Sequence, residues 1–349
     1  MFEQMNGKIG NWLRAGGEEP SVVLSSRVRL ARNLKGLTYP IYADNSTREQ
    51  VVSFVATAIE KSPLLESGGF YRSAEVNDLD RNFLIERHLI SPEFIQPESP
   101  SGVYIGTDEA TAIMVNEEDH LRVQTLGSGL SLSEVLKRAT GIDEELATTL
   151  DYDYDTDFGF LTSCPTNVGT GMRASILIHL AGLVLTKEID SVIDHITKLG
   201  LVVRGFYGEG SDVWGNLTQI SNQTTLGRSE HDIAESLEKI TRQIIEFENK
   251  ARERLVADAR DEIADKVWRA YGILRHARVL TSEETMNLFS ALRLGGALEL
   301  FDRVPLRTIN ELLLLTQPAH LQKYVGETLG ASQRDVARAS LVRERLAET

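Results

Sequence analysis

The hydrophobic pattern of this chain changes in character near residue 229. Before that point, short apolar or β-branched segments alternate with turns, as in VVLSSRVRL, SGVYIG, TAIMV and LGLVVR. Segments of this kind are typical of strands. Beyond it, apolar residues recur at helical spacing, and this spacing dominates from about residue 252. The sequence therefore predicts an α+β fold, with a mixed domain over residues 1–252 and a helical domain over 253–349.

Capping signals indicate where three of the helices begin. Ser229 is followed three positions later by Asp232, a capping-box pattern, and residues 233–247 then keep helical spacing. Thr281 and Ser332 each precede an acidic residue by three positions in the same way. We therefore expect helices that start at Ser229, Thr281 and Ser332.

Charge and cysteine content argue against several classes of function. The 349-residue chain has 51 acidic and 37 basic residues and a net charge of −14, which disfavours broad binding to nucleic acid or anionic membranes. Its one cysteine cannot form an intrachain disulfide, and its first residues lack the apolar run of a signal peptide. The longest apolar run, residues 176–185, is too short to span a bilayer. We expect a cytoplasmic protein with no nucleic-acid or membrane partner.

The segment LTSCPTNVGTGMRAS, residues 161–175, holds that cysteine, Cys164, and two closely spaced glycines. Its glycines formally fit the G-x-G-x-x-A dinucleotide fingerprint, with a possible strand before them and an expected helix beginning near Arg173. Pro165 interrupts the junction that this fingerprint needs, and no P-loop motif occurs in the chain. A glycine-rich turn before a core helix explains the same residues, so the motif alone leaves both interpretations open.

Five arginines lie at the edges of strand-like segments and turns. Arg27 and Arg29 are two positions apart on a predicted strand, so both side chains share one face. Arg122 and Arg204 lie in similar strand-like segments, and Arg173 lies at the glycine turn. A single arginine of this kind is more often structural. Together they predict a phosphate site, because guanidinium groups bind phosphate oxygens through two parallel hydrogen bonds.

The segments TAIMVN and HLRVQT read as two strands joined at an acidic turn, EED. Alternation in the second strand places Leu121 and Val123 toward the core, and Arg122 and Gln124 on the other face. The hairpin is therefore expected to present carboxylates and an arginine together.

Candidate acid–base groups lie in this turn and in a second one. Glu117, Glu118 and Asp119 form the first cluster, and Glu209 lies in the turn GFYGEG. Acidic turns are usually only solvated, and a lone cysteine is usually a small buried apolar residue. Carboxylates beside a phosphate site could instead orient a nucleophile and accept its proton, and nearby arginines would favour the Cys164 thiolate.

Five motifs in the same order resemble the ATP:guanidino phosphotransferases, the family of creatine and arginine kinases. They are SSRVRLAR, NEEDHLR, CPTNVGTGMR, VVRGFYGEG and SNQTTLGRSE, and they span about residues 20 to 250. The resemblance implies a largely antiparallel sheet flanked by helices. It also implies that the cofactors are ATP and Mg²⁺, with the metal held mainly by the ATP phosphates and by no protein ligand set.

The same resemblance implies roles for individual residues. Glu118 and Glu209 would be the catalytic carboxylates, and Cys164 would lie beside the guanidinium acceptor as a thiolate. The ATP-binding positions that match the family's motifs are Ser25, Ser26, Arg27, Val28, Arg29, His88, Arg122, Arg173, Ala174, Ser175, Ile176, Leu177, Arg204, Gly205, Phe206, Tyr207, Gly208 and Glu209.

The chain departs from creatine and arginine kinases in two features, and in both it resembles the bacterial protein-arginine kinase branch of the family. Only 24 residues precede Ser25, where those enzymes carry a helical N-terminal domain, and a helical C-terminal region is added. A more open acceptor site is expected, with free arginine a poor substrate. This branch implies phosphorylation of arginine residues in proteins, which marks them for regulated degradation. The alternatives are a small-molecule guanidino kinase and a non-catalytic adaptor that binds phosphoarginine.

The motif RDVARA in the C-terminal region belongs to the same resemblance. It implies an allosteric phosphoarginine site made by Arg334, Asp335, Arg338 and Ala339, whereas the residues alone equally allow a charged solvent face. The branch also implies a homodimer or higher oligomer. Its implied partners are a zinc-binding activator protein, a heat-shock transcription repressor and a Clp-type protease.

Overall fold

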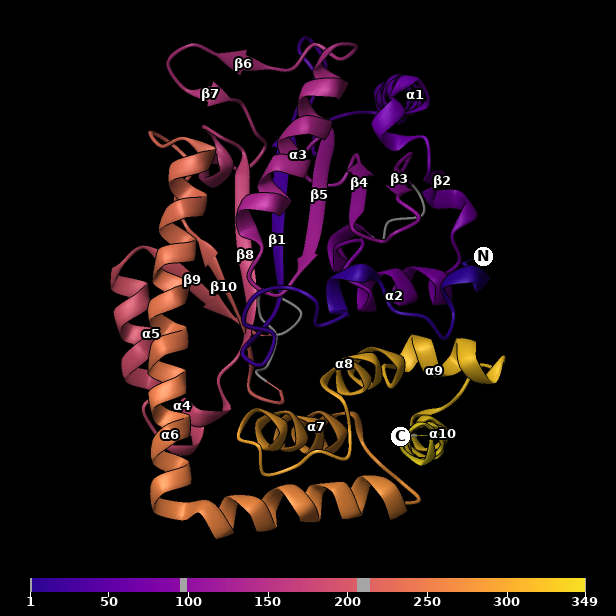
Figure 1. The fold of residues 1–349 in the computed structure, drawn as a ribbon. Coiled ribbons are helices and arrows are strands. Elements are labelled where there is room, and N and C mark those ends of the chain that lie inside the picture. Colours follow the sequence, from indigo (N-terminus) through magenta and orange to yellow (C-terminus); the bar gives the residue numbers. More distant parts are fainter. Residues whose placement is uncertain (1, 95–98, 206–213, 349) are drawn as a thin grey trace.

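A central antiparallel sheet organises the protein (Figure 1). The computed structural model describes residues 2–94, 99–205 and 214–348. Eight strands pair in the order β2-β3-β4-β5-β1-β8-β10-β9, and every pairing is antiparallel. A separate hairpin is formed by β6 (Tyr154–Asp155) and β7 (Gly159–Phe160). The sheet strands are β1 (Val23–Arg32), β2 (Gly69–Arg72), β3 (Gly102–Ile105), β4 (Thr111–Val115), β5 (Leu121–Ser128), β8 (Met172–His179), β9 (Leu201–Arg204) and β10 (Leu217–Asn222).

Helices cover the sheet and extend beyond its lower end (Figure 1). Short 3-10 turns also occur, including one at Asn11–Leu13. The α-helices are α1 (Asn45–Lys61), α2 (Asp78–Glu86), α3 (Leu132–Ala147), α4 (Ala181–Leu185), α5 (Ile189–Lys198), α6 (Glu230–His276), α7 (Ser282–Ala297), α8 (Leu306–Leu315), α9 (Pro318–Val325) and α10 (Ala331–Ala347). The expected α+β class is confirmed.

Two buried clusters lie on the two faces of the sheet. One joins the sheet to α1, α3 and the first half of α6 and includes Val28 on β1. The other joins Leu126 and Leu177, on the opposite face, to α2 and the C-terminal helices. Burial of apolar side chains stabilises a protein by roughly 1.5–3 kcal/mol per large residue. The C-terminal helices therefore contribute to the same packed structure as the sheet.

The segment after the glycine turn is a strand, which corrects the expected helix near Arg173. Residues Met172–His179 form β8, which lies between β1 and β10. Ala174, Ile176 and Ile178 are fully buried on one face, and Ser175 and Leu177 are buried on the other. A central strand buried on both faces has a nearly continuous apolar sequence, which resembles a buried helix in periodicity.

Helix starts are confirmed at two of the three expected positions. The Ser229 side chain accepts a hydrogen bond from the Asp232 N–H, and the Thr281 side chain accepts one from the Glu284 N–H. The expectation for Ser332 is wrong, because α10 begins two residues earlier with Gly330 as its N-cap. The Gly330 N–H donates to the Gln333 side chain, which fixes the earlier start.

Helix α6 runs through the expected boundary between residues 252 and 253. Its backbone departs from helical φ and ψ at Ala259, where the helix bends and continues beneath α7 (Figure 1). The division into two domains stays a prediction.

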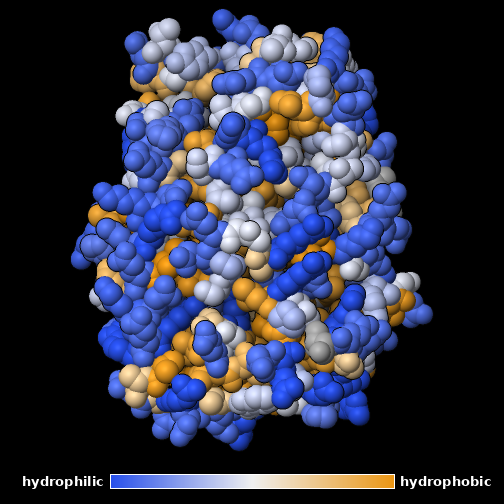
Figure 2. All heavy atoms as spheres, viewed as in Figure 1, coloured by the Kyte–Doolittle hydropathy of each residue, from blue (hydrophilic) through white to orange (hydrophobic). Residues whose placement is uncertain are grey.

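The face in Figure 2 is mostly hydrophilic, with apolar side chains scattered between charged ones. Among the described residues, no helix is both long enough and apolar enough to cross a membrane.

Candidate functional site

A cavity of about 730 Å³ collects most of the side chains expected to act. It lies on the face of the sheet opposite to the one that α3 covers. Val28 and Leu30 on β1 pack on the α3 side, so Arg27 and Arg29, which alternate with them, lie on the other face. The predicted residues among those that line it are Arg27, Arg29, His88, Glu118, Arg122, Cys164, Arg173 and Arg204.

Strand pairing explains why arginines far apart in the sequence meet here. In the registers between neighbouring strands, Arg29 pairs with Arg173 on β8, and Arg204 on β9 pairs with Gln219 on β10. Arg27 donates from Nη2 to the Gln219 Oε1, 2.7 Å away. Gln219 was missed by sequence reasoning, although alternation with the fully buried Ile220 could have indicated it.

The guanidinium groups repel one another in this cavity. Burial, together with the charges of Arg122, Arg173 and Arg204, lowers the pKa of Arg27 to about 10. Burial also lowers the pKa of Arg29, with added repulsion from neighbouring arginines. Like charges gathered in a partly desolvated site are costly unless an anion neutralises them. The cavity is therefore suited to a polyanion such as a triphosphate.

The turn between β4 and β5 supplies carboxylates at the edge of this cluster. Arg122 donates from Nη1 to the Glu117 Oε1 at 2.7 Å and from Nη2 to the Glu118 Oε2 at 3.1 Å. Glu117 also accepts from the Ser91 hydroxyl and is only 4% exposed at its side chain. The Glu118 side chain is 35% exposed, so it is the carboxylate that can reach a second substrate.

The pKa of Glu118 is raised above its ordinary value, chiefly by burial. The charge of Arg122 acts in the opposite direction, and the charges of Asp119 and Glu117 add to the rise. A raised pKa makes a carboxylate a stronger base.

Asp119 ties the loop that carries Cys164 to this carboxylate turn. Its Oδ1 accepts hydrogen bonds from the Asn33 Nδ2 at 2.7 Å and from the Ser163 N–H at 2.6 Å. The Ser163 hydroxyl donates to the Glu118 carbonyl oxygen at 2.7 Å. Asp119 is fully buried, so sequence reasoning that treats acidic turns as solvated missed its structural role.

Cys164 is half-buried and lines the cavity with Glu118. Its Sγ lies 3.0 Å from the Thr166 Oγ1, and either atom could be the donor. A hydroxyl at this distance can donate to a thiolate and stabilise its negative charge.

His88 lies where the cavity continues into a smaller hollow. Burial and the charges of Arg27 and Arg29 lower the pKa of His88 to about 3, so the ring is neutral at pH 7. Its ring centroid is 5.3 Å from that of Trp12 in an edge-to-face arrangement. The hollow is lined by Trp12, Arg27 and His88 together with three further predicted residues, Ser25, Ser175 and Leu177.

Four predicted ATP-binding side chains lie away from the cavity. Val28, Ala174 and Ile176 are fully buried in the core on the α3 side. The Ser26 hydroxyl donates to the Gly129 carbonyl at 2.9 Å on that same side. This corrects the sequence-based expectation, because successive side chains on β1 and β8 point to opposite faces.

The remaining segment expected to bind ATP is described only in part. Gly205 is buried at the end of β9 and does not line the cavity. Phe206, Tyr207, Gly208 and the expected second carboxylate, Glu209, lie outside the described residues.

The two glycines of the glycine turn, Gly169 and Gly171, are needed chiefly because the backbone there lies close to other segments of the chain. Gly169 has a φ of +114°, and a Cβ built there would lie 2.5 Å from the Thr225 carbonyl oxygen. Gly171 has a φ of +62°, and its Cβ would lie 2.5 Å from the Ala31 carbonyl oxygen. Only glycine fits such positions without moving the backbone.

We expect Gly169→Ala to lower the free energy of unfolding by at least about 2 kcal/mol, from left-handed backbone strain and the clash with Thr225. Gly141→Ala is the matched control, since α3 has open space at Gly141 and the change should raise stability by up to about 1 kcal/mol. Urea unfolding followed by circular dichroism measures both. Equal stability of Gly169→Ala and the wild type would contradict the packing described here.

The expected phosphoarginine motif occupies the start of α10. Arg338 is 1% exposed, and its Nε donates to the Thr316 carbonyl at 2.9 Å. Its Nη1 donates to the Leu280 carbonyl at 2.7 Å and pairs with Asp335. Ala339 is fully buried, and Arg334 is half-buried. The interpretation of this motif as a charged solvent face is therefore wrong for Arg338.

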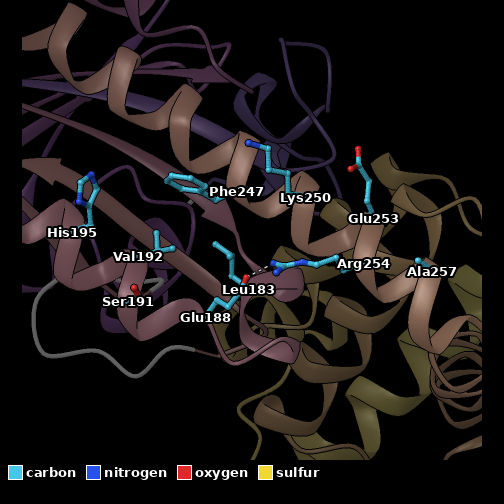
Figure 3. Close-up of a pocket in the computed structure, with 10 residues that line it drawn as sticks. All are labelled: Leu183, Glu188, Ser191, Val192, His195, Phe247, Lys250, Glu253, Arg254 and Ala257. Atoms are coloured by element: carbon cyan, nitrogen blue, oxygen red, sulfur yellow. Dashed lines mark hydrogen bonds and ion pairs between the residues drawn. The ribbon is translucent and has the colours of Figure 1, made fainter.

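A second hollow, of about 840 Å³, lies between α5 and α6 (Figure 3). Apolar side chains, including Leu183, Val192 and Phe247, share it with charged ones. Its guanidinium, that of Arg254, already pairs with Glu188. This hollow lacks the converging arginines of the sheet cavity and is not the candidate catalytic site.

Within the described ranges, no cluster of three or more His, Cys, Asp or Glu side chains could hold a metal ion.

Comparisons with known proteins agree with this arrangement. Residues 50–251 match the family described as ATP:guanido phosphotransferase, C-terminal catalytic domain. Residues 260–349 match the Protein-arginine kinase McsB C-terminal domain. The protein-arginine kinase of Pelotomaculum thermopropionicum is 46% identical over 99% of this chain and 98% of its own length. That of Halalkalibacterium halodurans is 46% identical over 97% of this chain and 95% of its own length.

Solved phosphagen kinases share the fold over about two thirds of the chain. A duplicated taurocyamine kinase from Schistosoma mansoni superposes with a TM-score of 0.62 and 24% identity, over 69% of this chain and 34% of that one. A lombricine kinase superposes with a TM-score of 0.59 and 27% identity, over 68% of this chain and 69% of that one. The chain therefore belongs to the ATP:guanido phosphotransferases and, within them, to the protein-arginine kinases. This confirms the family resemblance drawn from the sequence.

Proposed function

We propose that this enzyme transfers the terminal phosphoryl group of ATP to the guanidinium of arginine residues in proteins. The observation that carries the proposal is the single cavity in which five arginines meet Glu118 and Cys164. The full-length similarity to protein-arginine kinases favours a protein acceptor over a free one.

The chemistry requires a base, because a guanidinium is protonated at all working pH and its lone pairs are delocalised. Glu118 binds the acceptor cation, holds one nitrogen toward the terminal phosphorus and accepts the proton that this nitrogen releases. A nitrogen–phosphorus bond forms as the bond from phosphorus to the leaving oxygen of ADP breaks. Cys164 adds negative charge on the acceptor side.

The arginines stabilise charge on the transferring group. Arg27, Arg29, Arg122, Arg173 and Arg204 are held by the sheet, so they need little rearrangement to bind phosphate oxygens. Mg²⁺ bound to the ATP phosphates would supply further positive charge there. Ser25, His88, Ser175 and Leu177 would lie against the rest of the nucleotide. Glu209 remains our proposed second carboxylate.

An assay with two competing acceptors tests the proposed reaction. The protein is incubated with Mg-ATP, free arginine and a mixed protein pool, and phosphorus bound to nitrogen is detected by ³¹P NMR. We expect acid-labile phosphate on protein, because the similar full-length relatives are named protein-arginine kinases. Phosphate mainly on free arginine would instead indicate a small-molecule guanidino kinase. Phosphate on neither would indicate an adaptor without activity.

The raised pKa of Glu118 predicts the acidic limb of the pH–rate profile. Only the ionised carboxylate accepts a proton, so the rate falls as pH drops through this pKa. Because the folded-state pKa is raised, the fall should occur above the ordinary glutamate value of 4.5. A profile of kcat/KM against pH measures it. An acidic limb at or below 4.5 would contradict the assignment.

We expect Cys164→Ser to keep part of the activity, because Cys164 adjusts the charge of the site and does not accept phosphate. Single-turnover rates and mass spectrometry of the quenched protein measure this. A trapped phosphocysteine, or a complete loss of the transfer step, would overturn the role given to Cys164.

The motif at the start of α10 remains our proposed allosteric site for phosphoarginine, with Arg334, Asp335, Arg338 and Ala339. Arg338→Ala would also remove the hydrogen bonds to Thr316 and Leu280, so lost binding in that variant is ambiguous. Arg334→Ala is the cleaner test, since Arg334 is half-buried and its guanidinium donates to the Leu329 carbonyl of the neighbouring loop. Unchanged binding of free phosphoarginine in Arg334→Ala would count against the site.

The cellular role follows from the family resemblance and is part of the proposal. Phosphorylated proteins would be passed to a Clp-type protease, a heat-shock transcription repressor would be one target, and a zinc-binding protein would activate the enzyme. A homodimer or higher oligomer is the proposed assembly, which sedimentation at several protein concentrations tests.

A further inference from the structure

Arg293 on α7 carries a buried guanidinium that has no counter-charge among the described residues. It is 2% exposed, and it donates to the Asn310 side-chain oxygen and to the Pro20 carbonyl, both of which are uncharged. Its Nε has no hydrogen-bond partner among the described residues, and none of their carboxylates forms an ion pair with it. Burial and the charge of Arg252 lower the pKa of Arg293 to about 9. Buried charges are normally paired, so this one is suited to a bound anion.

Arg293 also lines a cavity of about 580 Å³ that shares no lining residue with the sheet cavity. This cavity lies between the end of α7 and the beginning of α8. Pro305, the N-cap of α8, makes no side-chain hydrogen bond to the first turn, and Pro305 and Leu306 line the cavity. The first N–H groups of a helix favour an anion. The start of α8 is therefore a second, independent feature of the cavity that favours a bound anion, as Arg293 does.

The rest of the lining limits which anion fits. The walls are mainly apolar, and the exposed carboxylates of Glu299 and Asp302 also line the cavity. These acids repel a multiply charged phosphate more strongly than a single carboxylate. The apolar wall residues, which would bury a hydrocarbon body, are Leu300, Phe301, Val304, Leu306 and Ile309.

We propose that this cavity binds a small monocarboxylate with an apolar body, whose carboxylate pairs with Arg293 and meets the first turn of α8. The site is separate from the catalytic cavity and is independent of the proposed kinase reaction. Arg293 also joins α7 to the segment before β1 through the Pro20 carbonyl, so the ligand would bind next to a contact between the C-terminal helices and the sheet.

Isothermal titration of the full-length protein with octanoate tests the proposal. We expect binding to the wild type and at least about tenfold weaker binding in Arg293→Gln, which loses the charge-assisted hydrogen bonds. Gly296→Phe gives a second variant that leaves Arg293 in place. Gly296 lines the cavity, and a Cβ there meets only the Phe301 carbonyl oxygen at 3.9 Å. The added ring should occupy the cavity and weaken binding to a similar extent.

Arg254→Gln is the matched control, because Arg254 is a surface arginine that pairs with Glu188 in the other hollow (Figure 3). Octanoate affinity should be unchanged in this variant. If Arg293→Gln does not fold, Gly296→Phe still decides the result. The proposal is overturned if octanoate does not bind, if both cavity variants bind it like the wild type, or if inorganic phosphate displaces it at equal concentration.

Discussion

Glu118→Gln should reduce kcat by at least about 100-fold, the scale expected for removal of a general base. Glu118 is the more exposed of the two carboxylates that pair with Arg122, and it lines the cavity beside Cys164. The amide keeps the shape of the side chain but can neither accept a proton nor balance the acceptor's charge. Single-turnover phosphorylation of a protein substrate measures the loss.

The matched control for this variant is Glu134→Gln. Its carboxylate is 77% exposed on α3, on the opposite face of the sheet, so its rate should equal that of the wild type. Far-ultraviolet circular dichroism should show the same fold for both variants. A Glu118→Gln enzyme with the wild-type rate would remove Glu118 from the mechanism.

Arg29→Met should lose about 100- to 1000-fold in kcat/KM, the range seen when one preorganised transition-state donor is removed. The same variant should be as stable as the wild type, or up to about 1 kcal/mol more stable. Arg29 has a buried Nε with no partner among the described residues, and neighbouring arginines repel it. The substitution therefore removes a repulsive charge while keeping most of the side-chain volume.

Arg254→Met separates this effect from a general loss of positive charge. Arg254 lies in the hollow between α5 and α6 and should be dispensable for activity (Figure 3). Thermal unfolding and steady-state kinetics are measured on both variants. A large loss of stability in Arg29→Met, or retention of full activity, would contradict a cavity built to receive an anion.

The sequence was sufficient to predict the class of fold and many of the side chains that line the sheet cavity. Alternation on the β5 strand placed Arg122 and Gln124 opposite Leu121 and Val123, and all four lie as expected. Such predictions succeed because strand alternation is a local property of the chain.

Features that depend on tertiary contacts could not be read in this way. β8 resembles a helix in sequence because the sheet buries both of its faces, which no local pattern reveals. Asp119 and Arg338 have the sequence context of solvated charges, yet both are buried and hydrogen-bonded to distant segments. Their partners are separated from them by many residues, so only the folded chain identifies them.

Competition between ATP and tripolyphosphate tests the central claim most directly, because tripolyphosphate carries the phosphates without the nucleoside. If the five arginines form the phosphate site, tripolyphosphate should displace ATP from the wild type, and Arg29→Met should weaken both ligands at least about tenfold. Equilibrium dialysis with labelled ATP measures both affinities. If tripolyphosphate does not compete and the affinity of Arg29→Met for ATP is unchanged, the arginine cavity is not where the phosphates bind.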